Sequence, residues 1–106
     1  MNEADHTRDA IRKRLAQIMP LHAKAILFGS RAKGTAKANS DWDILILLDK
    51  KQLQPADYDA VTFPLTLLGW ELDCEINPVM YSTREWSRYS VTPFYKNVER
   101  EGIIYW

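Results

Sequence analysis

Two short apolar stretches, the first followed by a glycine-serine turn and the second beginning at a pair of aspartates, constrain the fold of this chain most. Residues 25–28 and 42–48 are apolar and are bounded by turn-forming residues, a pattern typical of buried strands. The turn Gly29–Ser30 follows the first stretch, and Asp41 and Asp43 open the second. Because strand side chains alternate between faces, the two carboxylates are predicted on one face, with Cα atoms about 6.5 Å apart.

Two carboxylates at this separation repel each other unless a positive charge lies between them. A divalent cation meets that need, and Mg²⁺ binds one or two carboxylates while phosphates and water complete its shell. Asp41 and Asp43 are therefore predicted metal ligands. The segment from Arg31 to Ser40 carries three basic residues and no acidic one, so it provides local positive charge for a triphosphate. Those basic residues are Arg31, Lys33 and Lys37.

The Gly29–Ser30 turn is the predicted phosphate contact. Glycine lets the backbone approach a phosphate closely, and the first amides of a following helix favour an anion. We expect Ser30 to cap a short helix over residues 31–33 that Gly34 ends. Capping alone is the alternative interpretation of Ser30, and the two roles are compatible. Arg31 and Lys33 are the predicted basic contacts to the phosphates.

A third carboxylate is expected from a strand predicted over residues 71–81. Alternation along that strand places Asp73, Glu75 and Asn77 on one face. Glu75 is the preferred third acid and Asp73 the second choice, and a solvated strand face is the alternative for both. Glu75 would help to hold a second ion or would act as the base that activates an acceptor hydroxyl.

Length and composition limit the class of protein. The chain has 106 residues, of which 46% are hydrophobic, so one domain spanning residues 1–106 is expected. Acidic and basic residues number fourteen each, so overall charge gives no support to a nucleic-acid partner. The lone Cys74 excludes an internal disulfide and favours a reducing compartment. A charged beginning and the lack of a long apolar run argue against a secretory signal or a membrane span. We therefore expect a cytoplasmic protein.

Helical periodicity and end signals predict the remaining elements. Pro64 is expected to interrupt or bend one helix, and Gly69 to break it before the third strand. Pro78 cannot donate to a strand ladder, so it marks an edge position or the end of pairing. The expected helices cover residues 5–19, residues 56–68, a short turn through Trp86 that Ser82 or Thr83 caps, and a last helix between Thr92 and Gly102.

Three other motifs are excluded by single positions. Residues 29–34 have the spacing of a P-loop, but Thr35 and Ala36 follow where lysine and serine or threonine are required. A calcium loop beginning at Asp41 would need glycine where Ile46 stands. A nuclease pattern built on Glu75 would need lysine at position 77, which is asparagine.

The combined pattern resembles that of the polymerase-β-type nucleotidyltransferase superfamily, and the short length resembles its minimal members. The resemblance implies a small mixed β-sheet flanked by helices, that is, an α/β (α+β) fold. It also implies Mg²⁺ dependence, with two ions, and transfer of a nucleoside monophosphate from ATP or another triphosphate with release of pyrophosphate. Gly29 and Ser30 would then contact the triphosphate. The residues that carry the resemblance are Leu27-Phe28-Gly29-Ser30-Arg31-Ala32-Lys33-Gly34 and Ser40-Asp41-Trp42-Asp43-Ile44-Leu45.

Three hypotheses for function follow. The first is an enzyme that transfers AMP to a hydroxyl of a protein, nucleic acid or small molecule. The second, which the resemblance implies, is an antitoxin-like subunit that pairs with a helical toxin or with a second copy. The third is a domain that binds nucleotide without turnover, because the family's third acid is commonly an aspartate and Glu75 or Asp73 must serve here.

Overall fold

A computed structural model describes residues 2–106 and shows a four-stranded sheet with helices on both faces. The strands have the order β3-β2-β1-β4. β1 is antiparallel to β2 and β4, whereas β2 is parallel to β3, so the predicted small mixed sheet flanked by helices is confirmed. The elements are α1 (Glu3–Ile18), β1 (Lys24–Phe28), α2 (Ser30–Lys33), β2 (Trp42–Leu48), α3 (Pro55–Asp57), the π-helical turn η1 (Tyr58–Thr62), α4 (Phe63–Leu72), β3 (Ile76–Ser82), α5 (Thr83–Ser87), α6 (Pro93–Glu101) and β4 (Ile103–Ile104).

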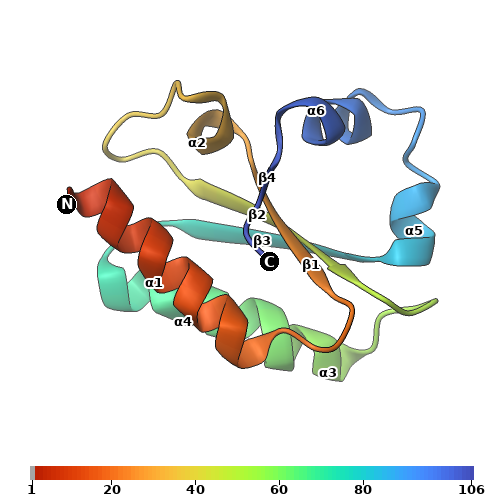
Figure 1. Cartoon of the computed structure of the whole chain (residues 1–106). Helices are drawn as coiled ribbons and strands as arrows, with labels where there is room; N and C mark the ends of the chain where they lie inside the picture. Colours follow the sequence, from red (N-terminus) through yellow and green to blue (C-terminus); the bar gives the residue numbers. More distant parts are fainter. Residues whose placement is uncertain (1) are drawn as a thin grey trace.

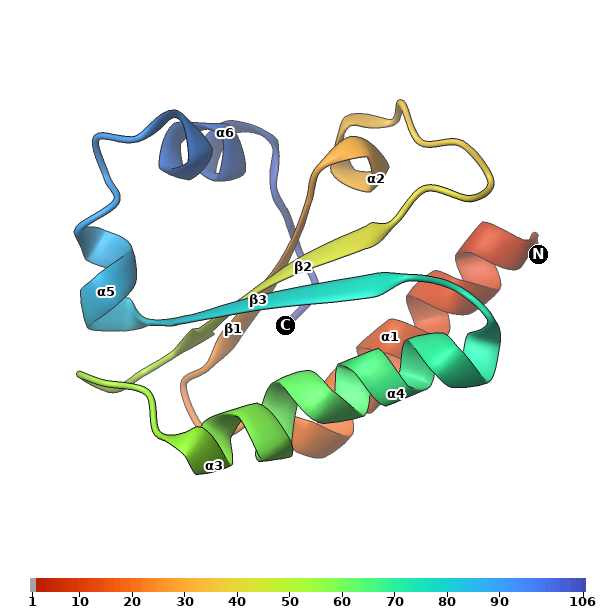
Figure 2. The same ribbon diagram turned by 180° about the vertical axis from the view of Figure 1, so that it is seen from behind.

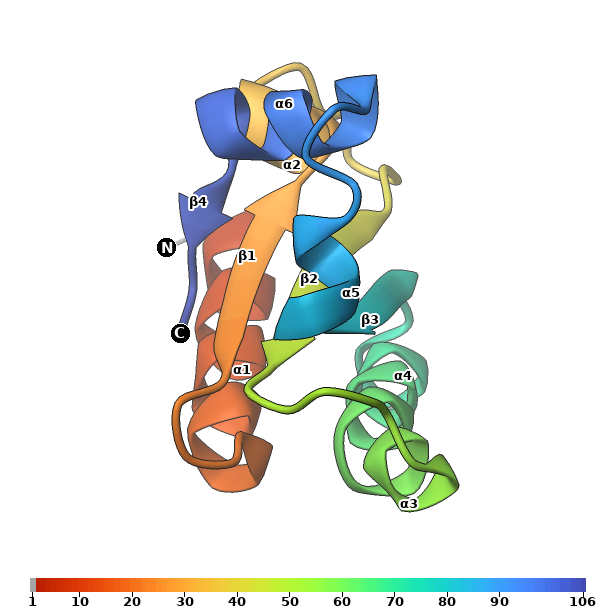
Figure 3. The same ribbon diagram turned by 90° about the vertical axis from the view of Figure 1, so that its right-hand side faces the viewer.

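The helices form two layers around the sheet. α1 and α4 cover one face, while α5 and α6 lie over the other, with α2 beside α6 (Figures 1 and 3). Seen from behind, β3 lies at the edge of the sheet that faces the viewer (Figure 2). Pro78 therefore lies on an edge strand, as predicted. Within residues 2–106, no helix is long and apolar enough to span a membrane.

β2 is buried on both faces because its side chains alternate between two hydrophobic clusters. Ile44 and Ile46 belong to the cluster under α1 and α4, and both are fully buried. Leu45 and Leu47 belong to the cluster under α5 and α6. A strand between two layers must be apolar on both sides, which explains the continuous apolar run. The predicted central strand is thus confirmed, and its first residues, which carry the aspartates, are the part left outside the core.

The second long helical segment is interrupted near Pro64, where the sequence predicts an interruption or a bend. Pro64 lacks an N–H group and cannot bond the carbonyl one turn earlier. The chain responds with the π-helical turn η1, in which the Phe63 N–H bonds the Tyr58 carbonyl. π-Helical turns occur mostly as single-turn insertions of this kind.

The start of the third strand was predicted wrongly. α4 continues to Leu72 and β3 begins only at Ile76. Gly69 does not break α4: it is buried, and a Cβ there would lie 2.8 Å from the Cys74 carbonyl. Glycine instead lets the returning chain cross close to the helix, and Asp73 ends the helix in a left-handed conformation with φ 55°. Residues 71–75 are therefore helix end and loop.

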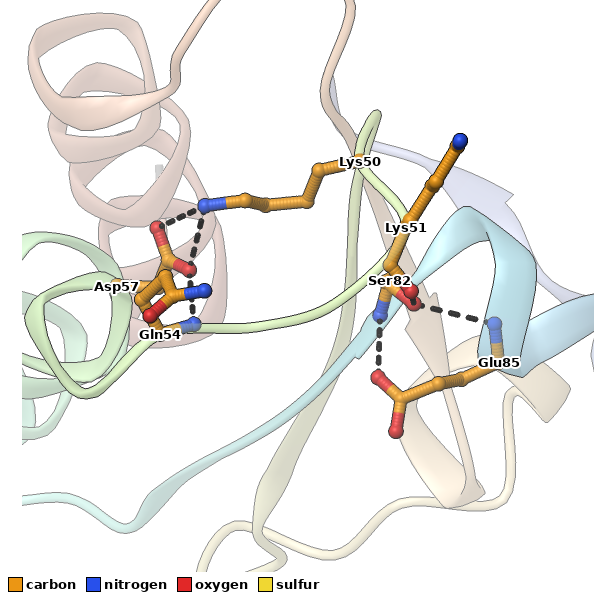
Figure 4. Close-up of polar contacts among 6 residues, drawn as sticks. All are labelled: Lys50, Lys51, Gln54, Asp57, Ser82 and Glu85. Atoms are coloured by element: carbon orange, nitrogen blue, oxygen red, sulfur yellow. Dashed lines mark hydrogen bonds and ion pairs between the residues drawn. The ribbon is translucent and has the colours of Figure 1, made fainter.

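The predicted helix caps near the C-terminus are confirmed. The Glu85 N–H donates to Ser82 Oγ at 3.1 Å, and the Ser82 N–H donates to Glu85 Oε1 at 3.1 Å (Figure 4). Ser82 Oγ also donates to the Lys51 carbonyl, which ties the end of β3 to the segment after β2. Thr92 caps α6 and Gly102 follows its last residue. The end of the chain forms β4 against β1.

A second polar cluster fixes the segment between β2 and α3. Lys50 Nζ lies 2.9 Å from Asp57 Oδ2, and the Gln54 N–H donates to the same oxygen at 2.7 Å (Figure 4). Both contacts favour the carboxylate form. The Gln54 N–H and then the Lys50 ammonium lower the pKa of Asp57.

Asp57→Asn is expected to reduce the free energy of unfolding by about 1 kcal/mol at pH 7, the usual size of a lost capping interaction. Because folding lowers the Asp57 pKa, its contribution is present above the unfolded pKa of about 3.9 and is lost as the pH falls through the folded value. Urea unfolding at pH 7 and pH 2.5 measures this. The exposed Asp59→Asn is the matched control, and an equal difference from wild type at both pH values would contradict the account.

Candidate active site

The turn after β1 brings the backbone against a carboxylate. Gly29 has φ 76° and ψ −157°, a conformation essentially reserved for glycine. A Cβ at this position would overlap Asp43 Oδ2. Gly29 is also the N-cap of α2, since its carbonyl accepts from Ala32 N and Lys33 N at 3.1 Å each. Ser30 is therefore the first helical residue and not the cap, which corrects that prediction and leaves its hydroxyl outside the capping bonds.

Asp41 and Asp43 lie together at the mouth of β2, as their spacing predicts. Phe28 pairs with Asp43 across the antiparallel ladder, so the carboxylate of Asp43 lies beside the Gly29 turn. Asp41 is exposed and Asp43 is half-buried. Trp42 points to the opposite face, where it is buried in the cluster under α1 and α4.

Asn77 is the site residue that sequence reasoning missed. It pairs with Asp43 across the parallel β2–β3 ladder, so the two side chains share a face. Its Nδ2 donates to Asp41 Oδ2 at 3.0 Å and to Asp43 Oδ1 at 3.3 Å. The signal that could have found it is the parallel register, which puts position 77 opposite the second aspartate.

The structure does not bring Glu75 and Asp73 to the aspartate pair. Both precede β3 and, with Trp42 and Arg31, line a pocket of about 680 Å³ between the beginning of α1 and the end of α4, to which neither Asp41 nor Asp43 contributes. Within residues 2–106, no three His, Cys, Asp or Glu side chains gather as a metal site. The groups that do meet at the mouth of β2 are two carboxylates, whose hard oxygens suit Mg²⁺, and the Asn77 amide, whose nitrogen donates to both of them.

Arg31 holds the loop that delivers Asp41. Its Nη2 donates to the carbonyls of Ala38 and Ser40 at 3.2 and 3.0 Å, and its guanidinium lies 4.4 Å from the ring centroid of Trp42. Stacking on the indole ring and the two contacts with carbonyl oxygens fix the position of the guanidinium beside Trp42. The structure thus gives Arg31 a positioning role between α2, the loop and β2.

Lys33 connects the turn to α6. Its Nζ lies 3.7 Å from Glu101 Oε2. The neighbouring Arg100, and after it Lys33, lower the pKa of Glu101. Both partners of this ion pair are partly exposed, so it contributes little to stability.

A family comparison decides what this arrangement belongs to. The sequence model of the nucleotidyltransferase domain family matches residues 8–104, which is most of the chain. The chain belongs to the nucleotidyltransferase domain family. The predicted family and the prediction of a nucleotidyltransferase are thereby confirmed, and the matched region contains the turn, both aspartates and Asn77.

Individual relatives add detail. The chain is 46% identical over 39 residues to the protein adenylyltransferase MntA of Aphanizomenon flos-aquae (strain 2012/KM1/D3), a stretch that covers 37% of this chain and 26% of that relative. A toxin-antitoxin crystal structure with AMP-PNP is similar with 27% identity and a TM-score of 0.65, covering 93% of this chain and 72% of that one. A minimal nucleotidyltransferase structure shares the fold at 22% identity and a TM-score of 0.59, covering 97% and 95%.

Proposed function

We propose that this domain transfers AMP from ATP to a hydroxyl acceptor in a Mg²⁺-dependent reaction. The observation that carries the proposal is the contact between the Gly29 backbone and the Asp43 carboxylate, with Asp41 on the same face. A backbone without a side chain can approach phosphates, and the adjacent carboxylates can hold the cation that accompanies them. The similarity to an adenylyltransferase and to a complex with AMP-PNP supports ATP as the donor.

The chemistry is an in-line displacement. The acceptor oxygen forms a bond to the α-phosphorus of ATP while the bond from that phosphorus to the bridging oxygen of the β-phosphate breaks. Pyrophosphate leaves, and the hydroxyl proton passes to water at the exposed end of β2. Asp41 and Asp43 would hold Mg²⁺, which supplies charge stabilisation of the phosphates when bound. Gly29 and Ser30 would orient the triphosphate through backbone amides and the hydroxyl.

A protein partner is the favoured acceptor class. The adenylyltransferase relative acts on protein, and the similar structure with AMP-PNP is a toxin-antitoxin pair. The surface of α4 fits a partner as well: Phe63 and Trp70 are 51% and 67% exposed and form an edge-to-face pair. Acidic residues and no basic ones occupy positions 52–83 around them. Our second candidate function for this chain is therefore that of an antitoxin-like subunit. Its partner would be a helical toxin subunit with a basic, apolar surface.

Calorimetric titration of ATP in Mg²⁺ tests the proposed function. Wild type is expected to bind ATP only with metal, and the Asp41→Asn/Asp43→Asn variant to lose that binding. Asp59→Asn is the control for the change of charge. Absence of binding in wild type would overturn the proposal for the isolated chain. Binding without release of pyrophosphate, with a co-purified helical partner present, would instead support a nucleotide-binding subunit without turnover.

A further inference from the structure

Asn77 occupies the position at which a third carboxylate would complete the site. β2 and β3 are parallel and in register from Trp42 opposite Ile76, so position 77 is the β3 residue that directly faces Asp43. The next residue of β3 on that face, Val79, is partly buried in the cluster under α5 and α6. The acids that precede β3, Asp73 and Glu75, line the pocket beside Trp42. No carboxylate of the described chain therefore reaches the aspartate pair from β3.

The amide of Asn77 donates hydrogen bonds to the aspartates, which a carboxylate at this position could not do. One nitrogen contacts an oxygen of each aspartate, at 3.0 and 3.3 Å, so the two carboxylates lie within the span of a single amide group. An N–H donor offsets part of the repulsion between the carboxylates without adding a charge. It also fixes the direction of both side chains, as outer-sphere partners of metal ligands do.

The charge of the site limits how many ions it can hold. Two carboxylates and the phosphates of one nucleotide provide a complete environment for one Mg²⁺, which otherwise keeps its waters. A pair of ions about 3.5–4 Å apart needs further anionic oxygens to offset four positive charges. Asn77 supplies a neutral group at the one β3 position that could provide them.

The geometry points to Asn77 as a positioning residue that bridges Asp41 and Asp43 and restricts the site to a single divalent cation per bound nucleotide. This inference rests on the proposed function, because it assumes the nucleotide and metal site. It replaces the pair of ions that the family resemblance implies with one.

The test is a Mn²⁺ titration followed by electron paramagnetic resonance, in which free Mn²⁺ gives the signal and bound Mn²⁺ does not. The chain is saturated with a non-hydrolysable ATP analogue. Wild type is expected to bind one Mn²⁺ and Asn77→Asp to bind two. Asn97→Asp on α6 makes the same chemical change away from the aspartates and is expected to bind one.

Two or more ions bound by wild type, or only one by a folded Asn77→Asp variant, would overturn the inference and leave the proposed function intact. No Mn²⁺ bound by wild type with the analogue would overturn both. Asn77→Ala provides a second test that adds no charge. It is expected to bind one Mn²⁺ about tenfold more weakly because the bridge between the carboxylates is lost, and an unchanged affinity would contradict the positioning role.

Discussion

Gly29→Ala is expected to weaken the proposed Mg²⁺-dependent binding of ATP, with a loss of affinity on the order of tenfold or more, because the carboxylate of Asp43, which we propose as a metal ligand, must move. The added Cβ would overlap Asp43 Oδ2, and the backbone at φ 76° and ψ −157° is strained for any residue with a side chain. That strain costs about 1–3 kcal/mol of stability. Calorimetry with ATP and urea unfolding measure the two effects.

Gly34→Ala is the control that separates the effect of the Cβ overlap with Asp43 from the effect of backbone strain. Gly34 has φ 80°, but a Cβ there meets no atom within 4 Å. This variant is expected to lose about 1–2 kcal/mol of stability from its left-handed backbone and to keep wild-type affinity for ATP. If Gly29→Ala bound ATP as tightly as Gly34→Ala, the close approach of backbone and carboxylate would not be a requirement of the site.

The central part of the fold was predictable because local patterns and tertiary structure agree there. The apolar runs of β1 and β2 are short and are bounded by turn residues, and β2 is buried on both faces whereas β1 is buried on one and partly buried on the other. The spacing of Asp41 and Asp43 needs only strand alternation to place them on one face. For the same reason Gly29 and Trp42 were placed correctly from neighbouring residues alone.

The errors lie where long-range contacts decide the structure. Gly69 has the local appearance of a helix breaker, yet it is an interior residue of α4 that allows the chain at Cys74 to pass close by. Apolar and polar residues also alternate over 71–77, which is typical of a strand. The predicted strand therefore began too early, in residues that form the end of α4 and the following loop. Asn77 was passed over because its importance depends on the register of two strands that are distant in sequence.

Arg31 shows a different limit. A basic residue two positions after Gly29 and near a pair of aspartates fits a phosphate contact, which stays a prediction. The structure adds contacts that its sequence neighbours do not indicate, with the carbonyls of Ala38 and Ser40 in the following loop and with the ring of Trp42 after it. The conformation of that loop cannot be derived from its small, polar composition.

Ile46→Ala is expected to have the largest effect on stability, with a loss of about 2–5 kcal/mol from the cavity that it creates. Ile46 is fully buried at the centre of β2, under α1 and α4. The total free energy of unfolding of a native protein is about 5–15 kcal/mol, so much of the stability of this chain would be lost. Urea unfolding followed by tryptophan fluorescence measures it.

Ile104→Ala is the matched control, because the same change at a side chain that is 69% exposed on β4 should cost less than about 1 kcal/mol. Under conditions in which Ile46→Ala is still folded, it is expected to bind ATP with wild-type affinity, since Ile46 points away from the face that carries Asp43. A fall in affinity greater than the loss of folded protein would show that the site depends on the packing of β2 and not only on its own contacts.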